Sequence, residues 1–422
     1  MNIKDYIKEN FGISDKVMSL AEEAEKEVLE HFKKVDETAF INQARVLKAF
    51  SDHRVSEAYF SQTTGYGYND LGREAIDNIY ADIFGAEDAL VRHNIISGTQ
   101  AISTAMWAVL RPGDTLVAVT GKPYDTLEGV IGKKGDNTGS LADFGVNYNV
   151  VDLKEDGNPD FEAIKKEVSK PGVRAVIMQR SKGYAWRSTF SVDLLDEIID
   201  FVHGINENIV CIVDNCYGEF ADTREPKGDL VAGSLIKNPG GGLANTGGYI
   251  AGKKEYVNLA ADRLFSIGAG KECGATLNQN RPMLQGFFMA PHVVAQAIKA
   301  SFLCGAIFEK LGFEVCPKVA EPHLDIITSI KFKSPELVIA FCKGIQKGAP
   351  VDSFAEPEPW EMPGYSDKVI MAAGAFCQGS SIELSADAPI REPYIAYIQG
   401  GLTYESAKIG IMVATQKVID LM

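Results

Sequence analysis

Short apolar segments separated by helix-length connections constrain the fold of this chain more than any other feature of its sequence. From about residue 70, segments rich in Val, Ile and Ala alternate with amphipathic segments whose periodicity predicts helices. Continuous apolar strands joined in this way indicate an α/β fold with a mostly parallel sheet covered by helices on both faces. The expected strands cover 115–119, 147–152, 174–178, 209–214, 229–234 and 248–251, and two expected helices cover 72–84 and 100–110.

The two ends of the chain differ from this middle part. Ser14 and Asp15 resemble a helix N-cap, and apolar residues at helical spacing follow over 15–32. We expect residues 1–60 to form an N-terminal helical arm that packs on the body or on a neighbouring subunit, and residues 61–290 to form a large domain. Residues 291–422 are expected to form a smaller α+β domain, with helices at 291–309, 335–346 and 404–421 and strands at 325–332, 369–375, 382–386 and 394–398.

Composition excludes several classes of protein. The 42 Lys and Arg against 57 Asp and Glu give a net charge of −15, which disfavours binding to nucleic acid. The seven cysteines form no Cys-x-x-Cys pair, and the six histidines form no His-Glu-x-x-His motif, so we expect reduced thiols and no metal site. The charged start MNIKDYIKENFG and the lack of an 18-residue apolar run predict a cytoplasmic protein without a membrane span.

Two groups of residues at expected strand ends are suited to a phosphate and to a planar ring. Ser97-Gly98-Thr99-Gln100 follows an apolar pair and opens a helix, where free N–H groups and the helix dipole favour an anion. An ordinary N-cap is the alternative. Tyr124 follows the strand expected at 115–119, and its ring could stack on a ligand, although any one of 15 tyrosines could lie there by chance.

An aspartate and a lysine stand at two further strand ends. Asp214 closes the apolar run IVCIVD, where a buried carboxylate is costly unless a cation or a strong donor faces it. Lys237 follows the strand expected at 229–234, with Ser234 three residues before it and Asn-Pro-Gly-Gly-Gly after it. A turn residue and a solvated loop lysine are the alternatives. The glycine run matches neither G-x-x-x-x-G-K-[ST] nor G-x-G-x-x-G, so it does not indicate a nucleotide loop.

Together these features fit pyridoxal 5'-phosphate. This cofactor needs a lysine for its aldehyde, an anion at its pyridine nitrogen, donors for its phosphate and an aromatic ring over its own ring. The chain supplies them in the order phosphate loop, tyrosine, aspartate and lysine.

The motifs around these residues resemble those of fold-type-I pyridoxal-phosphate enzymes of the cystathionine/methionine γ-lyase family. The closest resemblance is to its methionine γ-lyase-like, or aluminium-resistance, subgroup. The resemblance extends over essentially the whole chain and is carried by TGYGYNDLGRE (64–74), FGAEDALVR (84–92), SGTQAI (97–102), VDNCYGEF (213–220) and SLIKNPGGGLANTGGYIAG (234–252). It implies a fold of the pyridoxal-phosphate-dependent transferase type.

The resemblance also implies a role for each of these residues. Lys237 would hold the cofactor as a Schiff base, and Asp214 would pair with the pyridine nitrogen. Tyr124 would stack on the ring, and the phosphate would receive N–H groups from Gly98 and Thr99 and the hydroxyl of Ser234.

Three positions depart from the family pattern. The lyases reach the neighbouring subunit's phosphate with a Tyr-x-Arg segment, and this chain has Tyr66-Gly67-Tyr68 instead. Ile236 replaces a hydroxyl residue just before the lysine. No arginine precedes Gly401-Leu402, where the lyases bind the substrate carboxylate, so Arg391 is the preferred candidate for that role and Arg180 the second.

The implied reaction is that of a carbon–sulfur lyase. The enzyme would act on a sulfur-containing amino acid by Schiff-base formation, α-proton abstraction and β- or γ-elimination, in a homotetramer built from dimers with shared active sites. Transsulfuration, transamination and racemisation use the same equipment, because fold and cofactor do not choose among them. A cofactor-retaining stress or aluminium-resistance protein with little turnover is the alternative of another class.

Overall fold

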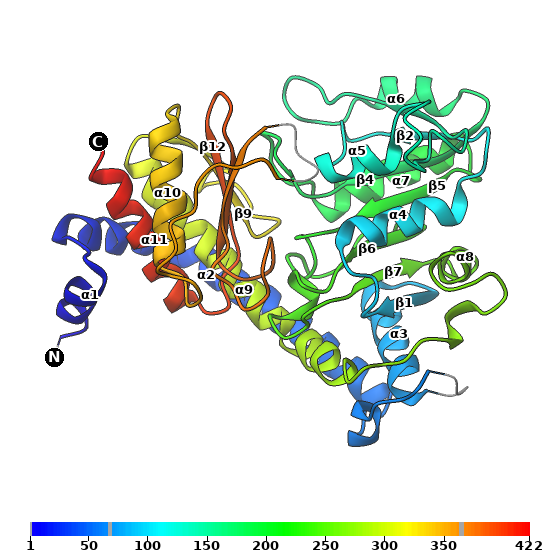
Figure 1. Cartoon of the computed structure of the whole chain (residues 1–422), viewed down its shortest axis with the longest axis horizontal. Coiled ribbons are helices and arrows are strands. Elements are labelled where there is room, and N and C mark those ends of the chain that lie inside the picture. The colour runs from blue at the N-terminus through cyan, green and yellow to red at the C-terminus, as the bar shows by residue number, and fades with distance from the viewer. Residues whose placement is uncertain (1, 66–69, 363–366) are drawn as a thin grey trace. The chain divides into compact units, whose positions relative to one another are not determined.

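A mixed sheet of seven strands organises residues 88–252 of this computed structural model, which describes residues 2–65, 70–362 and 367–422 (Figure 1). The strand order is β1-β7-β6-β5-β4-β2-β3, and the pairs from β6 to β3 are all parallel, whereas β7 and β1 are antiparallel to their neighbours. The mostly parallel sheet that the sequence predicts is therefore confirmed. The strands are β1 (Asp88–Arg92), β2 (Thr115–Ala118), β3 (Asn147–Val150), β4 (Val173–Gln179), β5 (Val210–Asp214), β6 (Leu230–Ser234) and β7 (Gly248–Gly252).

Helices cover this sheet, as its apolar strands require. The helices of this part are α3 (Leu71–Phe84), α4 (Gly98–Val109), α5 (Asp125–Ile131), α6 (Phe161–Val168), α7 (Val192–Ile205) and α8 (Lys254–Leu264). Helix α4 packs against β6 and β7, and α8 packs against α4 and β1. All five residues of each of β1, β5, β6 and β7 are buried, so the core of this part lies on both sides of these strands.

The C-terminal part contains a second sheet, which is antiparallel and has the order β10-β11-β12-β9-β8 among the described residues. Helix α10 packs on β10, β11 and β12, and α11 packs on α10 (Figure 1). The elements are β8 (Glu314–Cys316), β9 (Ile327–Lys331), α10 (Pro335–Lys347), β10 (Val369–Ala372), β11 (Ser385–Pro389), β12 (Ile395–Gln399) and α11 (Tyr404–Ile419). The strand expected at 382–386 thus begins three residues later, at Ser385.

Two compact units follow from the contacts within the chain. One comprises residues 42–183 and 190–288, and the other comprises residues 1–41, 184–189 and 289–422. Both main boundaries fall inside long helices, α2 (Asp15–Asp52) and α9 (Asn280–Lys310). Helix α1 (Ile3–Phe11) precedes them.

The helix expected over residues 15–32 is real but continues to Asp52 as α2. Its predicted apolar face is buried within the same chain, since Val17, Ala24 and Val28 have no exposed surface. Glu25 accepts hydrogen bonds from the hydroxyl of Tyr404 and the amine of Lys408, both of which belong to α11. The first part of α2 therefore packs on its own chain and does not need a neighbouring subunit to cover it.

Among the described residues, α9 alone is long and apolar enough to cross a membrane, and 72% of its most apolar 18-residue window is buried inside the protein. Such burial is typical of a core helix.

Candidate active site

Two neighbouring parallel strands bring the predicted aspartate and serine to one edge of the large sheet. Strand β5 ends at Asp214 and β6 ends at Ser234, and Asp214 is in register with Ala232. Helix α4 begins at the same place, because a Cβ atom on Gly98 would lie 3.5 Å from the Cβ of Ser234 and 3.0 Å from the Sγ of Cys216. The carboxyl ends of the strands and a helix N-terminus therefore meet at one site, as expected for a ligand-binding edge.

The N-terminus of α4 and the hydroxyl of Ser234 together form a place for an anion. Ser97 caps the helix by accepting a hydrogen bond from the N–H of Gln100 at 3.1 Å, and the first N–H groups of a helix have no partner within it. Ser234 is 1% exposed, and its Oγ has no hydrogen-bond partner among the described residues. An unsatisfied buried hydroxyl is costly, so a ligand that accepts a hydrogen bond here is favoured.

The carboxyl group of Asp214 is buried at the end of β5. Its Oδ1 accepts a hydrogen bond from the N–H of Cys216 at 3.1 Å. Burial raises the pKa of Asp214, and the Cys216 N–H and the amine of Lys237 oppose that rise only in part. A cationic group placed against this carboxyl would therefore be strongly favoured, because it would restore the ionised form.

Lys237 follows β6 and directly precedes a short 3₁₀ turn, η2 (Asn238–Gly240). Its side chain is half-buried, and its Nζ lies 3.6 Å from the centre of the Tyr217 ring. Burial opposes the charge of this amine, but Tyr217, Cys216 and Asp214 outweigh burial and raise the pKa of Lys237. The structure thus brings the predicted lysine and aspartate close enough to influence each other's protonation.

Tyr124 lies at the same edge of the sheet, immediately before α5. Its half-buried ring lies beside Gly183, since a Cβ atom on that glycine would be 3.1 Å from the Cδ2 of Tyr124 and 2.9 Å from the Nε2 of Gln179. Gln179 ends β4 and is in register with Asp214. Thr99 also belongs to this edge, where its hydroxyl hydrogen-bonds to that of Thr126 at 2.7 Å.

The two candidate arginines occupy different surroundings. Arg180 has no exposed surface, and its Nη1 lies 2.9 Å from the Oδ1 of Asn215 and 3.4 Å from a carboxylate oxygen of Glu225. Arg391 belongs to the other unit, where it is about half exposed and pairs with Asp367 at 2.7 Å. Because Arg180 is enclosed by the protein, Arg391 remains the preferred candidate for the substrate carboxylate.

Tyr66 and Tyr68, predicted to reach a neighbouring phosphate, lie outside the described residues. The described residues on either side of them, Gly65 and Asp70, each make a close contact or a hydrogen bond. Gly65 packs on Gly274 so closely that a Cβ atom there would lie 2.2 Å from the carbonyl carbon of Gly274. Asp70 on the other flank caps α3 by accepting a hydrogen bond from the N–H of Arg73.

Sequence reasoning did not single out three residues that the structure places at this site: Tyr217, Glu219 and Asn238. Asn238 is fully buried, and its Nδ2 donates to the carbonyl oxygens of Tyr217 and Glu219 at 2.9 Å each. All three lie inside VDNCYGEF and SLIKNPGGG, but no spacing rule connects them. Only the adjacency of these motifs to Asp214 and Lys237 could have drawn attention to them.

Glu219 is a buried acid beneath the site. Its Oε1 accepts a hydrogen bond from the hydroxyl of Tyr249 at 2.8 Å, and its Oε2 has no partner among the described residues. Burial, reinforced by the neighbouring Glu225, raises the pKa of Glu219 to about 8. This side chain is therefore mainly a neutral carboxylic acid at neutral pH.

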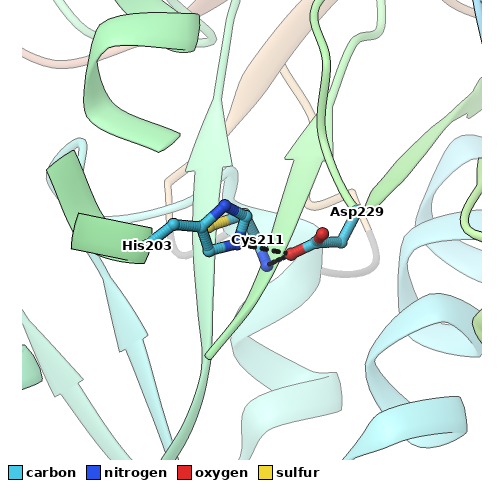
Figure 2. A group of neighbouring side chains, drawn as sticks. All are labelled: His203, Cys211 and Asp229. Carbon is cyan, nitrogen blue, oxygen red and sulfur yellow. Dashed lines mark hydrogen bonds and ion pairs between the residues drawn. The ribbon is translucent and has the colours of Figure 1, made fainter. Parts of the chain in front are cut away.

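Figure 2 shows a different cluster of possible metal ligands, His203, Cys211 and Asp229, whose ligand atoms lie within 4.8 Å of one another. It occupies the amino ends of β5 and β6, opposite the edge that holds Asp214. The Asp229 carboxylate already accepts from the Cys211 N–H at 2.7 Å and contacts His203 at 3.0 Å and Lys253 at 2.8 Å. These contacts give the cluster a structural role, in which Asp229 ties α7, β5 and the start of α8 together.

Comparison with known proteins identifies the family. A family model described as methionine gamma-lyase matches residues 17–419. The uncharacterized protein YnbB of Bacillus subtilis (strain 168) is 50% identical over 95% of this chain and 96% of its own length. A solved structure described as a carbon-sulfur lyase involved in aluminum resistance, from Clostridium novyi NT, is 50% identical with a TM-score of 0.95, covering 99% of this chain and 100% of that one.

A more distant structure, the pyridoxal-5'-phosphate-dependent protein YhfS of Escherichia coli, shares the fold at 16% identity with a TM-score of 0.62, covering 92% of this chain and 97% of its own. The fold is thus that of fold-type-I pyridoxal-phosphate enzymes, which confirms the predicted fold class. Family and neighbours indicate a carbon–sulfur lyase-like protein and imply pyridoxal phosphate as its cofactor. The match over nearly all of its length shows that the chain belongs to the methionine gamma-lyase family.

Proposed function

We propose that this chain is a pyridoxal-phosphate-dependent lyase that cleaves a carbon–sulfur bond of a sulfur-containing amino acid by β- or γ-elimination. The observation that carries the proposal is the meeting of three groups at the carboxyl ends of β5 and β6. They are Lys237, Asp214 and the hydroxyl of Ser234, which has no hydrogen-bond partner among the described residues. A reactive amine, a buried carboxyl and an anion site are the three contacts that this cofactor requires.

The residues present fit the cofactor on structural grounds. The unsatisfied Oγ of Ser234 and the N-terminus of α4 suit a phosphate, and the absence of a side chain at Gly98 leaves the helix end open. Gly98, Thr99 and Ser234 would hold the phosphate. Tyr124, at the same edge of the sheet, would cover the ring.

Asp214 and Lys237 would carry the charge and the proton of the reaction. When bound, pyridoxal phosphate supplies an electron sink for the carbanion formed at the substrate's α-carbon. The Asp214 carboxylate would hold a positive charge at the cofactor's ring nitrogen, and the burial of Asp214 would strengthen that interaction. The Nζ of Lys237 would hold the cofactor, and as a free amine it would take the α-proton of the substrate as a general base.

The substrate carboxylate, the assembly and the location complete the proposal. Arg391 offers a planar guanidinium that can bind a carboxylate through two hydrogen bonds, at the price of its pair with Asp367. It lines a pocket of about 290 Å³ with Tyr184, Trp186 and Tyr397. We also propose a cytoplasmic homotetramer in which Tyr66 or Tyr68 reaches the phosphate site of a neighbouring subunit.

Turnover assays test the reaction. Purified protein loaded with pyridoxal phosphate is incubated with cysteine, cystathionine, homocysteine or methionine, and release of keto acid is measured, with Lys237→Ala as the matched control. We expect keto acid and a sulfur product from at least one substrate, and none with the control. A cofactor-loaded protein that turns over none of them would instead favour a cofactor-retaining stress protein. Amino-group transfer without loss of sulfur would favour an aminotransferase.

A further inference from the structure

The loop after Asp214 has an unusual conformation beside the lysine. Tyr217 and Phe220 have φ angles of 71° and 60°, a left-handed region that side chains other than glycine rarely adopt. Such conformations persist only where the surroundings hold them, and they gather at functional sites. In this conformation Tyr217 is 9% exposed, and the centre of its ring lies 3.6 Å from the Nζ of Lys237.

The side chain of Asn238 holds this loop through hydrogen bonds. Its two hydrogen bonds to the carbonyl oxygens of Tyr217 and Glu219 are each 2.9 Å long, and its side chain is fully buried. The turn that carries Asn238 packs closely on the end of β6, since a Cβ atom on Gly240 would lie 1.7 Å from the carbonyl oxygen of Leu235. The backbone that carries Lys237 therefore also fixes the ring that faces its amine.

The face of an aromatic ring attracts an ammonium group, and the attraction grows when water is excluded. From these contacts we infer that Tyr217 is a positioning residue whose ring face holds the protonated amine of Lys237 whenever that amine is not bonded to the cofactor, and that Asn238 keeps the ring in place. This inference rests on the role proposed above for Lys237. The other titratable groups that face the amine are the carboxyl of Asp214 and the buried thiol of Cys216.

The contact between the Tyr217 ring and Lys237 would matter each time the Lys237 amine gains or loses a proton. An amine that removes a proton becomes an ammonium, and the ring keeps that ammonium beside the reacting edge instead of releasing it to solvent. Loss of the whole side chain should therefore lower the pKa of Lys237 more than loss of the phenol hydroxyl alone, which also interacts with the amine.

Titration of the cofactor-free protein tests this directly. Lysine amines are converted to ¹³C-dimethylamines, the Lys237 signal is assigned by its absence in Lys237→Arg, and its chemical shift is followed against pH in Tyr217→Leu and Tyr217→Phe. We expect Tyr217→Leu to lower the pKa of Lys237 by about 0.5 to 1.5 units and Tyr217→Phe to lower it by clearly less, because phenylalanine keeps the ring face and loses only the hydroxyl. Lys253, which pairs with Asp229, is the internal reference and should not move.

Two outcomes would overturn the inference: an unmoved pKa in Tyr217→Leu, or an equal fall in Tyr217→Phe. For Asn238, the variant Asn238→Ala should lower the same pKa, and adding Tyr217→Leu to it should lower the pKa little further. Fully additive shifts would show that Asn238 does not act through Tyr217. Because these titrations need no cofactor, they remain readable even if borohydride fixes the cofactor on another lysine and the proposed function fails.

Discussion

Replacing Glu219 with Gln should remove a pH-dependent loss of stability. Burial holds the pKa of this carboxyl near 8 in the folded chain, against an ordinary value of 4.5. Between these pH values the unfolded chain is ionised here and the folded chain is not, so stability falls as pH rises. At 1.36 kcal/mol per pH unit, the 3.5 units correspond to about 5 kcal/mol lost between about pH 4.5 and pH 8. Glutamine keeps an acceptor for the Tyr249 hydroxyl and does not ionise.

Urea unfolding of Glu219→Gln and of the unmodified protein at several pH values between about 5 and 8 measures this difference. The variant should gain stability relative to the unmodified protein by about 1.4 kcal/mol for each pH unit in this range. Glu207→Gln, at an exposed position, is the matched control and should give a curve parallel to that of the unmodified protein. Infrared spectra at neutral pH should also contain a protonated-carboxyl band that Glu219→Gln lacks. Parallel stability curves for Glu219→Gln, together with no such band, would refute the reasoning.

Three further predictions concern catalysis and assembly. Asp214→Asn should retain cofactor but lose at least about tenfold in activity, or about 1.4 kcal/mol, because a neutral amide no longer holds the ring nitrogen protonated; a smaller loss would argue against this role. Arg391→Lys should lower kcat/KM at least about tenfold while leaving the cofactor spectrum intact, and unchanged kinetics there with a collapse in Arg180→Lys would transfer the role to Arg180. Light scattering of active protein should give a mass of at least two chains of 45.8 kDa each, and the mass of a single chain would contradict a shared site.

Much of the large sheet could be predicted because its strands are continuous apolar runs. Strands β2, β4, β5, β6 and β7 all lie within one or two residues of the expected ranges. β1 and the three-residue β8 were not predicted, since short strands give little periodic signal. β11 was misplaced because its sequence, SADAP, has no large apolar residue, although all five of its residues are buried between two paired strands. Its tertiary surroundings decide its structure.

Helix α2 is longer than its apolar periodicity predicts. Its apolar stripe is clear as far as Phe32, and the prediction therefore ended there, whereas the helix continues through Asp52. Beyond Phe32, residues of α2 are also held by hydrogen bonds to distant parts of the chain. Asn42, for example, is fully buried and donates to the carbonyl oxygens of Phe220 and Asp222. Contacts with residues about 180 positions away leave no periodic trace in the sequence.

Some residues of the candidate site could likewise be predicted from the sequence, and others could not. Asp214 and Ser234 could be placed from sequence, because both end apolar strands and carboxyl ends of parallel strands share an edge. The buried pair of Arg180 and Glu225, and the contact of Tyr217 with Lys237, could not be found this way. They depend on which side chains a loop brings together, and no spacing in the chain encodes that.

Borohydride reduction of the cofactor-loaded protein, followed by peptide mapping, tests the central claim most directly. Reduction fixes the cofactor on the amine to which it is bonded, so the account predicts a yellow protein whose reduced adduct lies on Lys237, in the peptide containing SLIKNPGGG. An adduct on Lys253 or Lys271, or no adduct in a protein saturated with pyridoxal phosphate, would contradict it.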